Sequence, residues 1–170
     1  MTSRSTDSVL QGLKKTLDKI ALFHGHYCPG IAYGLRVSLA GIKLMAATDN
    51  FELNVVSGTR NCPVDAVQMI TGCTVGNGKL FLDDRDRQEF TFWNHAQNKG
   101  ILIKPKKVFY QESVAESEAM ERFAEGDKSR ETLRLVNARL QNKIECILLA
   151  KENDVIEVEQ LSFKPEILKD

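Results

Sequence analysis

The sequence lacks a net charge, a long apolar run and an apolar amino-terminal stretch. Its 170 residues carry 23 basic and 23 acidic side chains, so no overall field would draw the chain to nucleic acid or to an anionic membrane. No apolar run approaches the roughly 20 residues that a transmembrane helix needs. The segment 1–9 is polar and has no secretory signal, which predicts a soluble protein of the reducing cytoplasm.

Histidine and cysteine are also scarce, with three and four residues respectively. A chain of this length can bury a core without disulfides, which excludes a small disulfide scaffold and favours a single domain over residues 1–170. In a reducing compartment we expect the cysteines to be free thiols. They are Cys28, Cys62, Cys73 and Cys146.

The hydrophobic pattern predicts helices at both ends of the chain and strands between them. Segments with helical periodicity are 7–21, 31–46, 63–71, 114–124 and 129–147. Segments with strand character are 53–57, 74–82, 89–93, 101–103, 108–110 and 156–158. Helices around clustered strands favour an α+β fold with a mid-chain, mainly antiparallel sheet. Gly34 and Gly41 lie two helical turns apart and predict the close approach of a neighbouring backbone.

Two of the three histidines lie beside a cysteine, in His24-Gly25-His26-Tyr27-Cys28. Imidazole nitrogen and thiolate sulfur are donors that zinc prefers. Residues two apart do not share a helical face, but in an extended segment they lie on one face about 6.6 Å apart. A local metal site therefore requires a loop, which Gly25 favours. The alternative for His24 alone is a helix-terminal residue whose charge suits the helix dipole.

Cys28 and Cys62 are each followed by proline, which suits the first position of a helix. A thiol at such an N-cap faces unpaired N–H groups, so its thiolate should be stabilised as a nucleophile or metal ligand. The alternative is that cysteine fills space as a small hydrophobe. For Cys146, within the apolar segment 144–149, we expect that alternative.

Asp65 falls on the first turn of the helix that follows Cys62, and Gln68 one turn later on the same face. The helix dipole alone would favour a carboxylate there. The other interpretation is a general base beside the thiolate, or a partner that holds an imidazole. Cys73 should lie about 15 Å from Cys62 along a straight helix, so we do not expect the two to share an ion. Cys73 could still serve another part of a cleft, or that of a second subunit.

The glycines of the segment 72–78 have two interpretations. They could form a backbone nest for an anion, which would include Gly76, or simply a tight turn or bulge.

Two longer motifs, in segments 24–30 and 62–78, resemble the FmdE family, named for the E component of formylmethanofuran dehydrogenase. The family pattern reads H-G-H-x-C-P-G, then C-x-x-D-A-x-Q-x-x-T-G-C-T-x-G-x-G, and an aromatic strand like that at 90–93 follows. The resemblance is strongest over 22–93. Longer members append a cysteine-rich zinc finger, and this sequence has no Cys-x-x-Cys pair after Cys73.

The resemblance implies an α+β core that pairs as a homodimer, with the motif residues in a cleft, and a link to molybdenum or tungsten formylmethanofuran chemistry. The motif positions are His24, His26, Cys28, Cys62, Asp65, Gln68, Cys73 and Thr74. The implied partners are a small polar ligand or one-carbon carrier and a molybdenum or tungsten enzyme complex.

The first hypothesis is a metal-binding accessory protein or enzyme component of one-carbon metabolism. Its divalent ion, zinc or a similar metal, would be held by His26 and Cys28 with His24 or Cys62, which leaves a position for substrate. Asp65 and Thr74 would orient the ligand or a bound water. Candidate catalytic residues are Cys62, Asp65, Cys73 and Thr74, and candidate ligand-binding residues are Gln68 and Gly76.

Two other classes stay open. One is a cysteine-dependent enzyme or redox protein, in which Cys62 or Cys73 is the nucleophile and His24 or His26 its base. The other is a metal carrier or assembly protein without turnover.

Overall fold

The structure, a computed structural model, describes residues 3–46, 52–83, 85–108 and 110–168. Its helices are α1 (Ser3–His24), α2 (Pro29–Met45), α3 (Pro63–Thr71), α4 (Val114–Ala124), α5 (Arg130–Leu149) and α6 (Glu152–Val155), with a short 3-10 helix η1 (Glu166–Leu168). Its strands are β1 (Leu53–Ser57), β2 (Leu80–Leu82), β3 (Phe90–Asn94), β4 (Lys99–Pro105) and β5 (Ile156–Leu161). The α+β class predicted from the sequence is confirmed.

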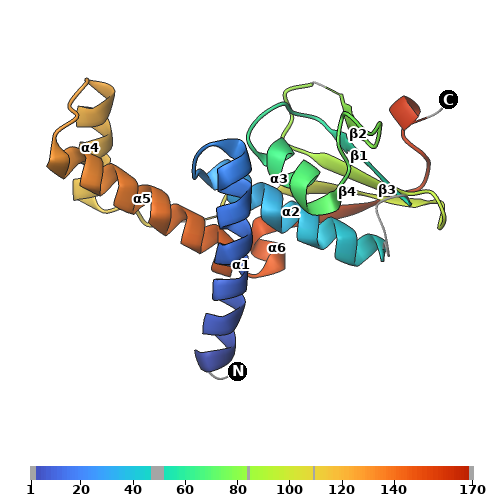
Figure 1. The fold of residues 1–170 in the computed structure, drawn as a ribbon, viewed down its shortest axis with the longest axis horizontal. Coiled ribbons are helices and arrows are strands. Elements are labelled where there is room, and N and C mark those ends of the chain that lie inside the picture. Colours follow the sequence, from blue (N-terminus) through green and yellow to red (C-terminus); the bar gives the residue numbers. More distant parts are fainter. Residues whose placement is uncertain (1–2, 47–51, 84, 109, 169–170) are drawn as a thin grey trace.

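The strands form one five-stranded sheet in the order β2-β1-β3-β4-β5. β1 and β2 are parallel, whereas the pairs β1–β3, β3–β4 and β4–β5 are antiparallel, as the sequence predicted for most of the sheet. Phe90, Phe92 and Ile101 are fully buried. They belong to the main core, together with apolar side chains of α2. Figure 1 shows α2 lying against the sheet.

Two glycines allow α2 to lie close to its neighbours. A Cβ added at Gly34 would lie 2.5 Å from the carbonyl oxygen of Pro63, and one added at Gly41 would lie 2.3 Å from the ring of Phe92. The predicted close approach of a backbone is therefore confirmed at Gly34, where it fixes the start of α3 against α2, whereas the neighbour of Gly41 is a side chain. Leu39, in the middle of α2, is 41% exposed and does not belong to the packed face of the helix.

Two predicted strands differ from the structure. Of the segment 74–82, only Leu80–Leu82 is a strand, because the residues before it form a turn. Val108 and Tyr110 lie outside the strands. There the hydroxyl of Tyr33 donates to the carbonyl of Lys106 at 2.6 Å and accepts from the N–H of Val108 at 2.9 Å. These side-chain bonds replace the ladder of a strand.

The helices α4 and α5 extend away from the sheet, and α1 projects in another direction (Figure 1). Ser113 caps α4 in a capping box with Glu116. Within the described ranges, no helix combines the length and the apolar character needed to cross a membrane.

Candidate metal centre

The loop between α1 and α2 carries three of the predicted ligands. α1 ends at His24, and Gly25 follows with a φ of 95°, a left-handed conformation that suits glycine. The chain then reaches Cys28, the N-cap of α2, whose backbone is extended, and Pro29 begins the helix. The segment is thus a loop rather than a continued helix, which was the condition for its side chains to converge.

The fourth ligand comes from the start of α3. Cys62 is the N-cap of α3, and Pro63 follows in the first turn, as predicted. Gly30 makes room for it: a Cβ added at Gly30 would lie 2.7 Å from the Cβ of Cys62 and 3.4 Å from the Sγ of Cys28. Cβ atoms essentially never approach that closely, so only glycine lets the two helix starts meet here.

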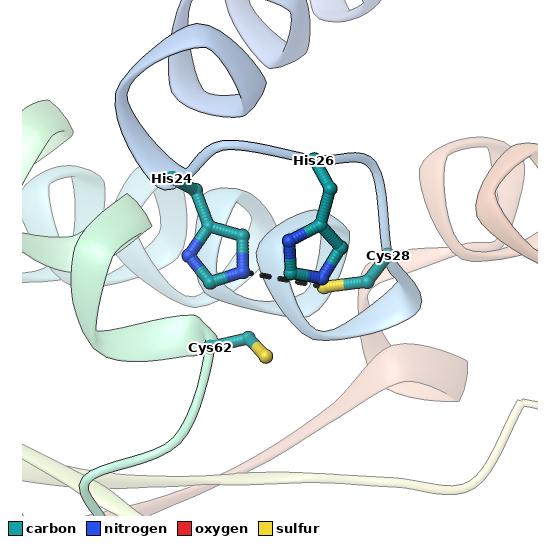
Figure 2. Close-up of side chains that lie close together, drawn as sticks. All are labelled: His24, His26, Cys28 and Cys62. Atoms are coloured by element: carbon teal, nitrogen blue, oxygen red, sulfur yellow. Dashed lines mark hydrogen bonds between the residues drawn. The ribbon is translucent and has the colours of Figure 1, made fainter.

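These side chains form one group, which we call the His/Cys group. Its members are His24, His26, Cys28 and Cys62, whose donor atoms all lie within 4.8 Å of one another. Figure 2 shows the two imidazoles and the two thiols facing a common centre. His26 is exposed, whereas the other three are partly buried. The structure therefore brings together every residue that the sequence proposed as a metal ligand, and the group could hold a metal ion.

Asp65 lies behind His24. Its Oδ2 is 2.7 Å from Nδ1 of the imidazole. The side chain of His24 is only 10% exposed. Nε2 of the same ring is 3.8 Å from the Sγ of Cys28 (Figure 2). A carboxylate on one ring nitrogen fixes the proton there and leaves the other as a lone-pair donor, which is the form that binds metal. Of the alternatives for Asp65, this geometry matches the partner that holds an imidazole.

The electrostatics of Cys28 differ from the expectation of a stabilised thiolate. Burial raises the pKa of this thiol, and the neighbouring Cys62 raises it further. The backbone N–H groups of Ile31 and Gly30 lower the pKa, but they do not offset the burial. The helix N-terminus alone therefore does not activate Cys28, and a cation in the group would be needed to favour its thiolate.

Cys73 lies apart from this group. Its side chain is fully buried in the main core, where Sγ donates to the carbonyl of Leu53 at 3.3 Å, and burial raises the pKa of the thiol. An inaccessible, protonated thiol does not line a cleft in this chain. We expected that Cys73 and Cys62 do not share an ion. Cys73 is not a member of the His/Cys group, which agrees with this expectation.

The segment 72–79 is a turn held by side chains. Oδ1 of Asn77 accepts from the N–H groups of Thr74 and Lys79, and its Nδ2 donates to the carbonyl of Gly72. The N–H of Val75 donates to Oε1 of Gln68 at 3.2 Å. These N–H groups already have acceptors, so the hydrogen bonds describe a tight turn rather than an anion nest.

The structure assigns the remaining candidates to that turn. Gln68 tethers it, and the hydroxyl of Thr74 accepts from the N–H of Asn77. Gly76 is exposed, and a Cβ added there would lie 3.9 Å from the Thr74 hydroxyl. Sequence reasoning missed Gly30, because its role appears only when two segments distant in the chain meet. The sequence showed only that it follows a Cys-Pro step and ends the first of the two family motifs.

Fold and site together define an α+β protein with a His/Cys group that could hold a metal ion between two helix starts. The FmdE family profile, described as "FmdE, Molybdenum formylmethanofuran dehydrogenase operon", matches residues 23–157. The chain belongs to the FmdE family, as its motifs indicated.

Two relatives illustrate the range of the similarity. The crystal structure of a protein from Syntrophus aciditrophicus, which is like the FmdE component of tungsten formylmethanofuran dehydrogenase, has the same fold. Its TM-score is 0.62, with 24% sequence identity over 92% of this chain and 76% of that one. A probable S-adenosyl-L-methionine-binding protein of Archaeoglobus fulgidus is 30% identical over 97 residues, or 54% of this chain. The match spans only 26% of that protein's length.

Proposed function

We propose that this protein binds a divalent transition metal, zinc, through the His/Cys group. The observation that carries the proposal is the convergence of two imidazoles and two thiols within 4.8 Å from two separate helix starts. Tetrahedral zinc holds nitrogen and sulfur donors about 3.3 to 3.8 Å apart, given its bond lengths of about 2.0 to 2.3 Å. Small side-chain movements would bring the group to that spacing.

Two further contacts support this proposal. Asp65 holds the imidazole of His24 in the tautomer that a metal ligand requires, and Gly30 leaves the space in which Cys28 and Cys62 approach each other. If all four side chains bind, the tetrahedral shell is full and a small ligand would reach the ion by displacing His24 or Cys62, whereas His26 and Cys28 with only one of these two would leave a position for it. A zinc ion there would act as a Lewis acid toward a small polar molecule.

The proposed role is an accessory or enzymatic component related to molybdenum or tungsten formylmethanofuran dehydrogenase, in the cytoplasm. Family membership supports this relation, and the proposed ligand is a small polar molecule or a one-carbon carrier. The name of the Archaeoglobus relative adds S-adenosyl-L-methionine as a compound to test by calorimetry. A molybdenum or tungsten enzyme complex is the proposed macromolecular partner.

We also propose a homodimer. Leu22 and Phe23, beside the His/Cys group, are 87% and 61% exposed, and Val114 on the projecting α4 is 75% exposed. Such apolar side chains suit a surface that another chain covers. Light scattering on the purified protein would give twice the mass of one chain, and a monomer at all concentrations would contradict this part of the proposal.

The metal proposal is tested by elemental analysis of the purified protein and its Cys28→Ala and Cys146→Ala variants. Cys146 is a matched control, because it is also a partly buried free thiol but lies outside the His/Cys group. We expect zinc in the wild type and in Cys146→Ala, and its loss in Cys28→Ala. Equal metal content in all three proteins would contradict the proposal.

A second candidate function, a cysteine-dependent enzyme, has one observation in its favour. Cys28 Sγ, His24 Nε2 and the Asp65 carboxylate form a thiol–imidazole–carboxylate series. The thiol in this series is Cys28, not Cys62 or Cys73. A catalytic thiolate would react with iodoacetamide well below the ordinary thiol pKa of about 8.5 and in metal-free protein, whereas a zinc-bound thiolate would be protected by the ion.

A further inference from the structure

A second site candidate is a cavity of about 660 Å³ between the start of α2, the segment after β4, and α5. Its volume is within the range of small-molecule sites, about 300 to 1,000 Å³. The rings of Tyr33 and Tyr110 form part of its walls, and Cys146 also lines it. The cavity corrects the prediction for Cys146, which is partly exposed there rather than enclosed in the core.

The cavity concentrates positive charge in a chain whose net charge is zero. Its charged lining residues are Lys107, Glu112, Arg139 and Lys143. Arg139 and Glu112 pair with each other, and the guanidinium holds the pKa of that carboxyl below its usual range. Among the described residues, no carboxylate forms a direct ion pair with Lys107 or Lys143. Lys143 lies near enough to Glu112 to help lower the pKa of that carboxyl, but Glu112 makes its direct contact with Arg139. The two ammonium groups can therefore still form direct bonds with a ligand.

The walls of the cavity are held in place by their own hydrogen bonds. Tyr33 ties the segment that carries Lys107 to α2 through its bonds to Lys106 and Val108. The hydroxyl of Tyr110 donates to Glu116 at 2.6 Å. The Nζ of Lys143 lies 5.9 Å from the centroid of the Tyr110 ring. Because the hydroxyls are already bonded, the rings of the two tyrosines are the parts that could pack against a ligand. Lys143 already lies over the Tyr110 ring, so a ligand there would contact the ammonium group and the ring together.

We propose that this cavity binds a small molecule whose carboxylate or phosphate group lies between Lys107 and Lys143 and whose flat apolar part packs against Tyr33 and Tyr110. Ammonium groups form strong charge-assisted bonds with such anions, and aromatic rings favour flat partners. Pro29 lines the cavity and directly follows Cys28. On the basis of the proposed function, we place the anionic end of the substrate in this cavity, next to the helix start that carries Cys28.

The test uses phenyl phosphate, benzoate and benzyl alcohol as probes, titrated calorimetrically into the full chain with and without zinc. We expect both anions to bind and benzyl alcohol not to, with affinity falling as salt is added. The preferred anion distinguishes a phosphate site from a carboxylate site. The variant with both Lys107→Gln and Lys143→Gln should bind at least about tenfold more weakly, the loss expected for charge-assisted bonds.

The matched control is Lys99→Gln, an exposed lysine at the start of β4 that does not line the cavity. Circular dichroism confirms that each variant is folded. Equal binding of benzyl alcohol, or unchanged anion binding in the double variant, would overturn the proposal. The variant Cys28→Ala separates the two proposals. If this variant still binds the anionic probes, and the wild-type protein contains no zinc, only the metal proposal fails. If zinc binds but neither anion does, only the cavity proposal fails.

Discussion

The Asp65 carboxylate lies 2.7 Å from Nδ1 of His24 and so directs the opposite nitrogen of the ring toward Cys28. This contact joins the first turn of α3 to the last residue of α1. A side chain that holds a metal ligand by its second nitrogen acts on affinity without touching the ion. Asp65 is therefore a positioning residue of the proposed zinc site.

Replacement of Asp65 by asparagine should lower zinc affinity by about 10- to 100-fold, because the amide binds the imidazole more weakly and leaves its tautomer free. Competition with a chromogenic chelator measures the affinity. Asp86→Asn is the control, since Asp86 is exposed in a turn whose positive φ asparagine tolerates. Wild-type affinity in Asp65→Asn would show that the carboxylate does not position the ligand.

Replacement of Gly30 by alanine should displace Cys62 and weaken zinc binding, because the new Cβ would lie 2.7 Å from the Cβ of Cys62. Gly12→Ala provides the comparison: that glycine is exposed on α1, and an added Cβ would meet nothing within 4 Å. The control should keep its zinc affinity and gain up to about 1 kcal/mol in the free energy of unfolding from helix propensity. Equal zinc affinities in the two variants would remove Cys62 from the ligand set.

Oxidation of the metal-free protein with diamide should join Cys28 and Cys62 in a disulfide, because their sulfur atoms lie within 4.8 Å of each other. Zinc should prevent this reaction by sequestering both thiolates. Peptide mass mapping identifies the disulfide. If zinc-saturated protein oxidises as quickly as the metal-free form, at least one of the two thiols is not a ligand, and the redox alternative gains support.

The joint between α4 and α5 should weaken in acid because of Glu116. Hydrogen bonds from Tyr110, Ser113 and Asn142 lower the pKa of this carboxyl to about 2 in the folded protein. A folded pKa below the ordinary value of 4.5 stabilises the fold above that pH, and the contribution is lost as the pH falls toward 2.

Glu116→Gln should therefore be less stable than wild type at pH 7, and the difference should shrink at pH 3. Urea unfolding followed by circular dichroism at both pH values measures it. Glu118→Gln, an exposed neighbour on α4, is the control and should show no such trend. A difference that is the same at both pH values would mean that the ionised form of Glu116 contributes nothing.

Local chemistry made the helix starts of the site predictable. The Cys-Pro steps at Cys28 and Cys62 located both N-caps, because proline at the first helical position has a physical reason that needs no tertiary contact. The scarcity of histidine and cysteine elsewhere drew attention to the ligands that the structure brings together. The stabilised thiolate predicted at Cys28 was wrong, because burial, a tertiary property that the local sequence does not show, raises the pKa of this thiol.

The strand predictions that were wrong lie where side chains form the hydrogen bonds that a neighbouring strand would otherwise form with the backbone. Asn77 and Gln68 satisfy the N–H groups that a longer β2 would have used, and Tyr33 does the same after β4. The cavity beside α5 could not be predicted from the sequence for a related reason. Its lysines, Lys107 and Lys143, come from separate elements, and neither segment carries a motif.

The two helix starts that Gly30 lets meet are far apart along the chain. Cys62 follows Cys28 by 34 residues, and the whole of β1 lies between them. An ion held by both thiolates closes that length into a loop and limits the conformations of the unfolded chain, much as a disulfide does. Zinc would therefore act as a removable crosslink, and chelation should lower the free energy of unfolding of the whole chain, including the sheet to which β1 belongs.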